Sequence, residues 1–140
     1  MDKVLVDAPC SGVGTWRRHP EQKWRLKPDD VRRLTQLQGE ILSSAARMVR
    51  PGGWLVYSTC SFLREENEDQ IENILVAKNP GQKNFQIVPI ADVWNTLLKI
   101  PYLTGPGSFE ASHFFKVGPS YSWNRWFFIP ILQKKESVRG

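Results

Sequence analysis

The chain has 140 residues, the size of one domain, and 41% of them are hydrophobic, which is enough for a packed core. Its formal net charge is +5, which is compatible with a polyanionic partner but does not require one. The sequence contains no apolar stretch of about eighteen residues and no signal-peptide pattern. These absences exclude a membrane-spanning helix and predict a cytoplasmic protein.

The chain has two cysteines, Cys10 and Cys60, which lie far apart in the sequence. In a reducing compartment, two lone thiols are expected to stay reduced. His19 and His113 lie at no spacing from them that is typical of a zinc site. We therefore expect no metal in this protein.

The first half of the chain predicts a strand, a basic loop and a helix. An apolar run at 3–7 ends in an acid and indicates a buried strand, and small residues follow it. The segment 16–27 is basic and irregular. Apolar residues recur at helical spacing over 29–50, with Pro28 and two acids at the start. Pro51, Gly52 and Gly53 should end this helix.

The second half opens with another apolar strand, at 54–59, which ends next to Cys60. A helix is expected at 65–78, where the acids Glu65 to Asp69 should serve the helix dipole. The remaining expected elements are a strand at 85–90, a short helix at 91–100, a loop at 101–121 and a strand at 126–132, in which Pro130 indicates an edge or a bulge.

Alternating strands and helices predict an α/β fold with a parallel sheet. Ligands of such sheets bind beyond the carboxyl ends of the strands. Here two strands end in Asp7-Ala8-Pro9-Cys10 and Ser58-Thr59-Cys60. If these strands are neighbours, both thiols lie at the same rim of the sheet.

Two thiols at one rim suit chemistry on a pyrimidine. Cytosine C5 is a poor nucleophile, but a thiolate that adds at C6 creates enamine-like electron density at C5, which can then accept a methyl group. The thiol must be partly ionised near neutral pH. Basic residues at 17–27, or the start of the helix after Cys60, are expected to lower its pKa.

The segments Asp7-Ala8-Pro9-Cys10-Ser11-Gly12 and Tyr57-Ser58-Thr59-Cys60-Ser61 resemble motifs IV and VI of the RNA 5-methylcytosine methyltransferases of the Sun/Fmu family, which act on ribosomal RNA. Residues between and after them also resemble that family, among them Arg17-Arg18-His19-Pro20, Val49-Arg50-Pro51-Gly52-Gly53 and Glu65-Glu66-Asn67-Glu68. The resemblance covers about residues 3–78 closely. Two cysteine motifs together are far more specific than either alone.

The resemblance implies a role for each matching residue. Cys60 would be the nucleophile that bonds to cytosine C6, and Cys10 would assist release of the product. Asp7 would contact the cofactor, S-adenosylmethionine. Pro9 would shape the loop under the base. On charge alone, Arg17, Arg18 and Lys23 are candidates for contacts with RNA phosphates, and Trp24 among them could stack on a base.

The family's fold is a Rossmann-like methyltransferase fold, and only the C-terminal half of its sheet is expected here. The glycine-rich cofactor loop and the N-terminal RNA-binding region would belong to a missing N-terminal half of the same enzyme. The sequence therefore predicts one partial catalytic domain over 1–140. Arg125-Trp126 stand where the family usually has an Asp-Gly pair, so the resemblance weakens towards the C-terminus.

Two alternatives stay open. The chain could be a non-catalytic remnant that binds RNA or a partner protein, and titration with S-adenosylmethionine separates this from an enzyme. It could also be a thiol redox protein, which predicts a disulfide between Cys10 and Cys60. The sequence lacks the Cys-x-x-Cys motif of such proteins, which disfavours this reading.

Overall fold

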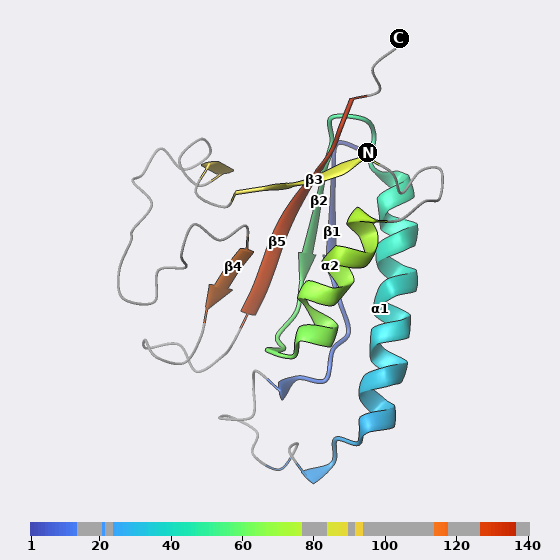
Figure 1. Ribbon diagram of the computed structural model, residues 1–140, viewed down its shortest axis with the longest axis vertical. Coiled ribbons are helices and arrows are strands. Elements are labelled where there is room, and N and C mark those ends of the chain that lie inside the picture. Colours follow the sequence, from blue (N-terminus) through green and yellow to red (C-terminus); the bar gives the residue numbers. More distant parts are fainter. Residues whose placement is uncertain are drawn as a thin grey trace.

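The computed structural model describes residues 1–13, 21, 24–76, 84–89, 92–93, 114–117 and 127–136. Two helices, α1 (Pro28–Met48) and α2 (Glu68–Leu75), pack beside a five-stranded sheet (Figure 1). The strands are β1 (Lys3–Asp7), β2 (Trp54–Ser58), β3 (Phe85–Val88), β4 (Phe114–Val117) and β5 (Phe127–Lys134). The predicted α/β class is confirmed.

The sheet is mixed rather than parallel. Its strand order is β1-β2-β5-β3, with β4 also paired to β5. β1 and β2 are parallel, but β5 runs antiparallel to β2, β3 and β4. The prediction of a parallel sheet was therefore wrong for β5. Apolar spacing identifies a strand but not its direction, and an antiparallel partner such as β4 needs no helical crossover.

Helix α1 begins as its sequence indicates. Pro28 occupies its first turn, and the Asp30 carboxylate accepts a hydrogen bond from the Lys27 N–H at 3.0 Å. The helix ends at Met48, before the turn at Pro51 and Gly52. Gly52 has a φ of 78°, a conformation that glycine adopts without strain.

The core lies between the two helices and one face of the sheet. Alternate residues of β1 and β2 point into it, as the parallel register pairs Val4 with Leu55 and Val6 with Tyr57. Helix α1 contributes the buried residues Gln38, Leu42, Ala45 and Ala46. Ile71 and Ile74 of α2 and Phe128 and Leu132 of β5 complete this cluster.

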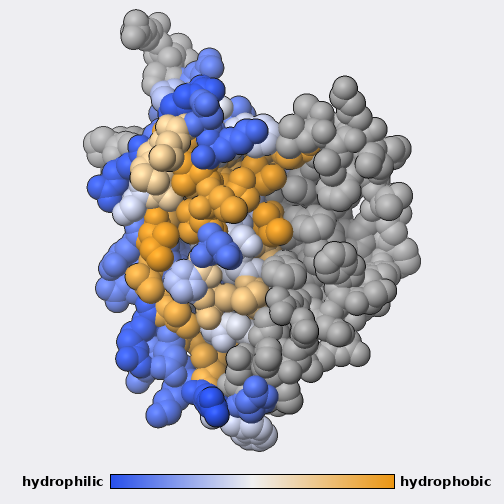
Figure 2. All heavy atoms as spheres, turned by 180° about the vertical axis from the view of Figure 1, so that it is seen from behind, coloured by the Kyte–Doolittle hydropathy of each residue, from blue (hydrophilic) through white to orange (hydrophobic). Residues whose placement is uncertain are grey.

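The opposite face of β1 and β2 is less covered. Figure 2 shows an apolar surface there, on the side of the sheet away from the helices. Leu5 of β1 is 69% exposed, and β1 alternates between exposed and buried residues along its length. The predicted buried strand is thus buried on one face only, because both described helices pack on the same side.

Two expectations for the second half differ from the structure, and a third is mostly outside the described residues. The helix expected at 65–78 is divided into a 3-10 helix, η3 (Arg64–Glu66), and α2. The expected loop at 101–121 contains β4. Most of the helix expected at 91–100 lies outside the described residues.

Pro130 marks neither an edge strand nor a bulge against β2, because the register of β5 with β2 is the same on both sides of it. It is buried in β5, which lies between β2 and β3. Pairing of β5 with β2 is recorded at Ile131↔Val56 and resumes at Phe128↔Thr59. Pro130 falls in this gap, where its lack of an N–H removes a donor from the ladder.

No helix in the described part of the chain is long and apolar enough to cross a membrane.

Leu132→Ala and Leu5→Ala form a matched pair that tests this core. Leu132 is fully buried opposite Leu55, whereas Leu5 is 69% exposed. We expect Leu132→Ala to lower the free energy of unfolding by about 2–5 kcal/mol, and Leu5→Ala by about 0.5 kcal/mol or less. Urea denaturation with an unchanged slope measures both. Equal losses would contradict the assignment of the core to the helix-covered face.

Candidate functional site

The candidate site lies where β1 and β2 end. The two strands pair in parallel from Lys3↔Trp54 to Asp7↔Ser58, and the Ala8 N–H extends the ladder to the Ser58 carbonyl at 2.9 Å. The loops that carry the two cysteines therefore leave the sheet side by side. This confirms the prediction that the two strands are neighbours.

Cys10 and Cys60 meet at this rim. Their Sγ atoms lie 3.1 Å apart and share a hydrogen bond in which either sulfur can be the donor. Both cysteines are free and half-buried, so no disulfide joins them here. The structure thus brings together the two thiols that the sequence predicted to share one rim.

The shared hydrogen bond gives the two thiols different acidities. It lowers the pKa of Cys10 to about 7, despite burial, and backbone hydrogen bonds from Cys60 and Gly12 act in the same direction. The same bond and burial raise the pKa of Cys60. Because the two thiols titrate as a pair, one proton is lost near neutral pH and the second is retained.

The sequence predicted a lowered pKa for Cys60. This prediction is wrong for the site without bound RNA, where the pKa of Cys60 is raised. The largest influence on the pKa of each thiol is the hydrogen bond to the other sulfur, 3.1 Å away. The basic residues at 17, 18 and 23 lie outside the described part of the chain. The effect of one thiol on the pKa of the other leaves no pattern in the sequence.

A network of buried polar groups fixes the loop of Cys60. The Thr59 hydroxyl donates to the Asn67 amide oxygen at 2.5 Å, and the Asn67 amide donates to the Ser61 carbonyl at 2.7 Å. Thr59, Ser61 and Asn67 are all at most 1% exposed. The residues on both sides of Cys60 are thus held by the segment before α2.

The Glu66 carboxylate connects the two cysteine loops. It is fully buried, and four donors converge on it. The Ser11 N–H and the Ser11 hydroxyl each donate at 2.7 Å, the Gln38 amide donates at 3.2 Å, and the Ser61 hydroxyl donates at a shorter distance. Ser11 and Ser61 directly follow Cys10 and Cys60, so one carboxylate ties both sulfur-bearing loops together.

Sequence reasoning missed this role. The expectation that the acids after Cys60 serve the helix dipole is wrong for Glu66, which lies in η3 and faces inward. A signal was present in the order of residues. Each cysteine is followed by a serine, and a buried carboxylate needs donors of this kind.

Gln38 joins Pro9 to the same network. The side-chain amide of this buried α1 residue donates to the Pro9 carbonyl at 2.8 Å as well as to Glu66. Pro9 itself is exposed, and the hydrogen bond from the buried Gln38 side chain holds its loop. The Gln38 Oε1 atom is buried and has no hydrogen-bond partner among the described residues.

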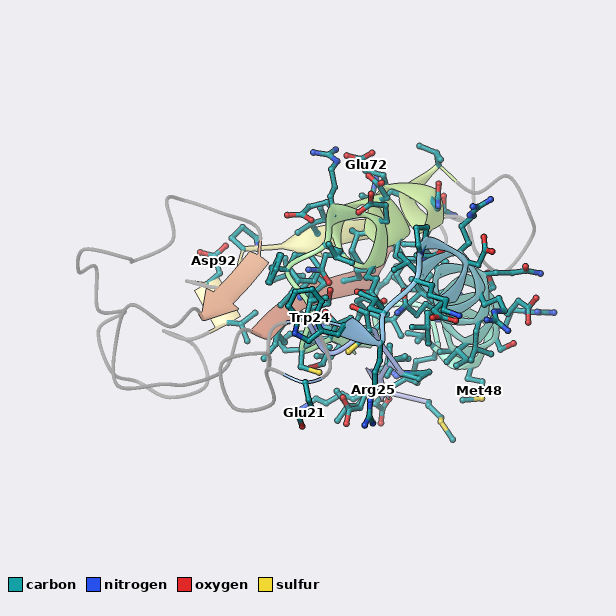
Figure 3. All side chains as sticks on the ribbon, turned by 90° about the horizontal axis from the view of Figure 1, so that it is seen from below. Glu21, Trp24, Arg25, Met48, Glu72 and Asp92 are labelled. Carbon is teal, nitrogen blue, oxygen red and sulfur yellow. The ribbon has the colours of Figure 1, made fainter. Side chains whose placement is uncertain are left out.

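The other predicted site residues have different outcomes. Asp7 is exposed at the end of β1 and lines a groove of about 580 Å³ between β1 and α1. Arg17, Arg18 and Lys23, like His19 and His113, lie outside the described residues. Trp24 is 85% exposed, and Figure 3 shows it with Arg25 at the end of the molecule where β1 and β2 finish.

The thiol pair gives a pH prediction with two opposite signs. In Cys60→Ala, Cys10 loses the hydrogen bond that lowers its pKa and keeps the burial that raises it, so its pKa should rise from about 7. In Cys10→Ala, Cys60 loses the bond that raises its pKa, which should fall. Rates of iodoacetamide alkylation against pH measure both. Shifts of the same sign would contradict a coupled pair.

Glu66→Ala and Glu65→Ala separate the buried acid from its exposed neighbour. Glu66→Ala leaves four donors without their acceptor and should cost about 3 kcal/mol or more in the free energy of unfolding. Glu65→Ala should change it by about 0.5 kcal/mol at most. Glu66→Gln should cost less than Glu66→Ala, since hydroxyl groups can reverse to accept. Similar losses for Glu65 and Glu66 would refute the role of the network.

A family model described as 16S rRNA methyltransferase RsmB/F matches residues 1–96. The ribosomal RNA small subunit methyltransferase B of Salmonella paratyphi B is 53% identical over 97 residues, in a match that covers 61% of this chain and 23% of the relative. The protein of the same name from Salmonella heidelberg gives the same values. The chain thus spans about a quarter of the length of these curated relatives.

Solved structures resemble the chain over most of its length. PH0851 has a TM-score of 0.70 and 38% identity, over 95% of this chain and 26% of its own. A methyltransferase homologue from Pyrococcus horikoshii has a TM-score of 0.66 and 32% identity, over 96% of this chain and 39% of its own. NSun6 from Pyrococcus horikoshii, solved with SFG, has a TM-score of 0.69 at 23% identity, which supports the fold alone.

These neighbours confirm the predicted Rossmann-like methyltransferase fold, of which the chain covers a part. The family model and the Salmonella relatives confirm the resemblance that the two cysteine motifs indicated. The chain belongs to the 16S rRNA methyltransferase RsmB/F family and corresponds to part of its catalytic domain.

Proposed function

We propose that this chain carries the two catalytic thiols of an RNA cytosine-C5 methyltransferase that acts on ribosomal RNA. The observation that carries the proposal is the 3.1 Å contact between Cys10 and Cys60, at the carboxyl ends of adjacent parallel strands, in a chain of this family. Ligands of α/β sheets bind at such ends. The contact supplies two sulfurs where a flipped-out base would enter.

Cys60 is the proposed nucleophile and Cys10 its partner. The pair loses one proton near neutral pH, so a single proton is shared across the sulfur contact. Its transfer to Cys10 leaves Cys60 as a thiolate, which adds to cytosine C6 and makes C5 nucleophilic. After methyl transfer a base, water in the simplest case, takes the C5 proton, and the electron pair of the C–H bond restores the C5–C6 double bond and expels the Cys60 thiolate. Cys10 assists this last stage from the adjacent loop.

The buried network serves this chemistry by orienting the sulfurs. Glu66 holds the loops of both cysteines through Ser11 and Ser61, and Gln38 holds the loop at Pro9. Rotations and shifts of about 1 Å at a reacting centre are costly in rate, so fixed loops favour attack. The hydrogen bond to Cys10 and burial raise the pKa of Cys60, and the nearby Glu66 charge raises the pKa of both thiols in addition.

Asp7 is the proposed cofactor residue. Its carboxylate is exposed at the end of β1, beside the groove next to α1, and a carboxylate suits the positive sulfonium of S-adenosylmethionine. The cofactor, when bound, supplies an electrophilic methyl group. The match covers 23% of the curated relative, and we propose that other parts of such an enzyme complete the cofactor site.

Ribosomal RNA is the proposed substrate. The chain has a formal charge of +5, and exposed Trp24 and Arg25 lie at the end of the molecule that carries the thiols (Figure 3). We propose that Arg17, Arg18 and Lys23 contact phosphates near this end and that Trp24 stacks on a base. The charge is shared by many basic proteins, so the thiols and not the charge carry the assignment.

A hybrid enzyme tests this proposal. The matching segment of the Salmonella methyltransferase B is replaced by the equivalent segment of this chain, and transfer of radiolabelled methyl groups to small-subunit ribosomal RNA is measured. We expect Cys60→Ala to lower transfer about a thousandfold or more. Cys10→Ala should accumulate a covalent protein–RNA adduct that survives a denaturing gel, because release is blocked.

The double variant Cys10→Ala with Cys60→Ala is the control for the adduct. It keeps the release defect of Cys10→Ala but lacks the proposed nucleophile, so no adduct should form. Substantial turnover by Cys60→Ala, or an adduct in the double variant, would refute the assignment of Cys60. A wild-type hybrid that binds S-adenosylmethionine but transfers no methyl group would favour the non-catalytic alternative.

A further inference from the structure

The thiol pair has a reactivity that needs neither RNA nor a methyl donor. The Cys10 and Cys60 sulfurs are 3.1 Å apart, and a disulfide bond requires about 2.05 Å. An approach of about 1 Å therefore separates the observed pair from a covalent bond. Both residues lie beyond the residues that pair β1 with β2, so this approach breaks no hydrogen bond of that ladder.

We propose that Cys10 and Cys60 form an oxidisable dithiol, a modification site that hydroperoxides close to an intramolecular disulfide and that trivalent arsenicals bridge. Both thiols are half-buried and so partly open to small reagents. They are also the only cysteines in the sequence. Any intramolecular disulfide of this chain must therefore join these two residues.

The surrounding network favours closure within one molecule. Glu66 holds Ser11 and Ser61, and each serine is the next residue after a cysteine. The sulfurs consequently stay near each other without a search through loop conformations, which gives them a high effective concentration. A second chain in solution cannot compete at ordinary protein concentrations.

The oxidation balances in two steps. A thiolate of the pair attacks one peroxide oxygen, the O–O bond breaks, and a sulfenic acid forms while the leaving hydroxide becomes water. The other sulfur then attacks the sulfenic sulfur, the S–O bond breaks, and a second water leaves. Two thiols lose two electrons and two protons in total, and the peroxide is reduced to two waters. The Cys10 thiolate present near neutral pH is suited to the first step.

An arsenical tests the same proximity without oxidation. Phenylarsine oxide bonds two thiol sulfurs through one arsenic atom, and its oxygen leaves as water with the two thiol protons. The reaction requires both sulfurs within reach of one atom, as they are here. Bridging should protect the pair from peroxide, and a dithiol reagent should reverse it more readily than a monothiol.

The consequence for catalysis rests on the proposed function. A disulfide leaves no thiol for attack on cytosine, so oxidation would stop methyl transfer until a reductant restored the pair. The dithiol itself is assayed without methyl transfer, so the two proposals can fail separately. A fully reduced hybrid that transfers no methyl group, although its two cysteines still close to a disulfide on oxidation, would refute the enzyme assignment and leave the dithiol proposal standing.

The experiment treats the reduced 140-residue chain with one equivalent of hydrogen peroxide. Free thiols are counted with a chromogenic disulfide, and peptides are mapped by mass spectrometry without reduction. We expect loss of both thiols, a Cys10–Cys60 linked peptide pair in a monomer, and full recovery with dithiothreitol. One phenylarsine oxide should bind per chain and prevent this loss.

The single variants Cys10→Ser and Cys60→Ser are matched controls. Each retains one thiol, which should be trapped by dimedone as a sulfenic acid and should not bind the arsenical tightly. Circular dichroism shows whether each variant is folded. In the wild-type chain, sulfinic acids on separate cysteines, disulfide-linked dimers or unreacted thiols would each overturn the proposal, whatever the variants do.

Discussion

The parallel pairing of β1 with β2 is the constraint on which the site depends. Buried side chains alternate along both strands, so a shift of one residue would turn Val6 and Tyr57 out of the core. The register is thus fixed by core packing. Because Asp7 pairs with Ser58, Cys10 and Cys60 follow at similar distances beyond the ladder, and their sulfurs meet. The position of the chemistry is in this sense a consequence of hydrophobic packing several residues away.

Hydrophobic packing does not orient the two cysteine loops. The Glu66 carboxylate orients them. A buried carboxylate is costly unless donors satisfy it, and here four donors come from α1 and from both cysteine loops. Removal of the Glu66 carboxylate would take this acceptor from all four donors at once. The Glu66 backbone also accepts the Tyr57 hydroxyl at 2.8 Å, which ties the acid to β2. The core and the site are therefore parts of one cooperative unit.

Sequence patterns were sufficient where the signal is local. Apolar runs located β1 and β2, helical spacing with Pro28 located α1, and cysteines after two strands located the shared rim. The patterns failed where the outcome depends on partners. The direction of β5, the pairing that makes β4 a strand, and the inward turn of Glu66 all involve residues remote in the sequence. The prediction for Glu66 was wrong because acids near a helix start usually face water. In the sequence, only the serines that follow the two cysteines indicate that this acid is buried.

The contact that suits methyl transfer also exposes the site to oxidants. Proton exchange between two sulfurs requires a separation near that of a hydrogen bond, and at 3.1 Å a disulfide lies within a small movement. Glu66 acts on both properties at once. Its hydrogen bonds hold the sulfurs together, whereas its charge raises the pKa of both thiols and so restrains the thiolate that reacts with peroxide. An uncharged acceptor could receive the same hydrogen bonds from the loops, but it would lack the charge that raises the pKa of both thiols. A buried carboxylate at this position therefore reconciles close sulfurs with moderate reactivity.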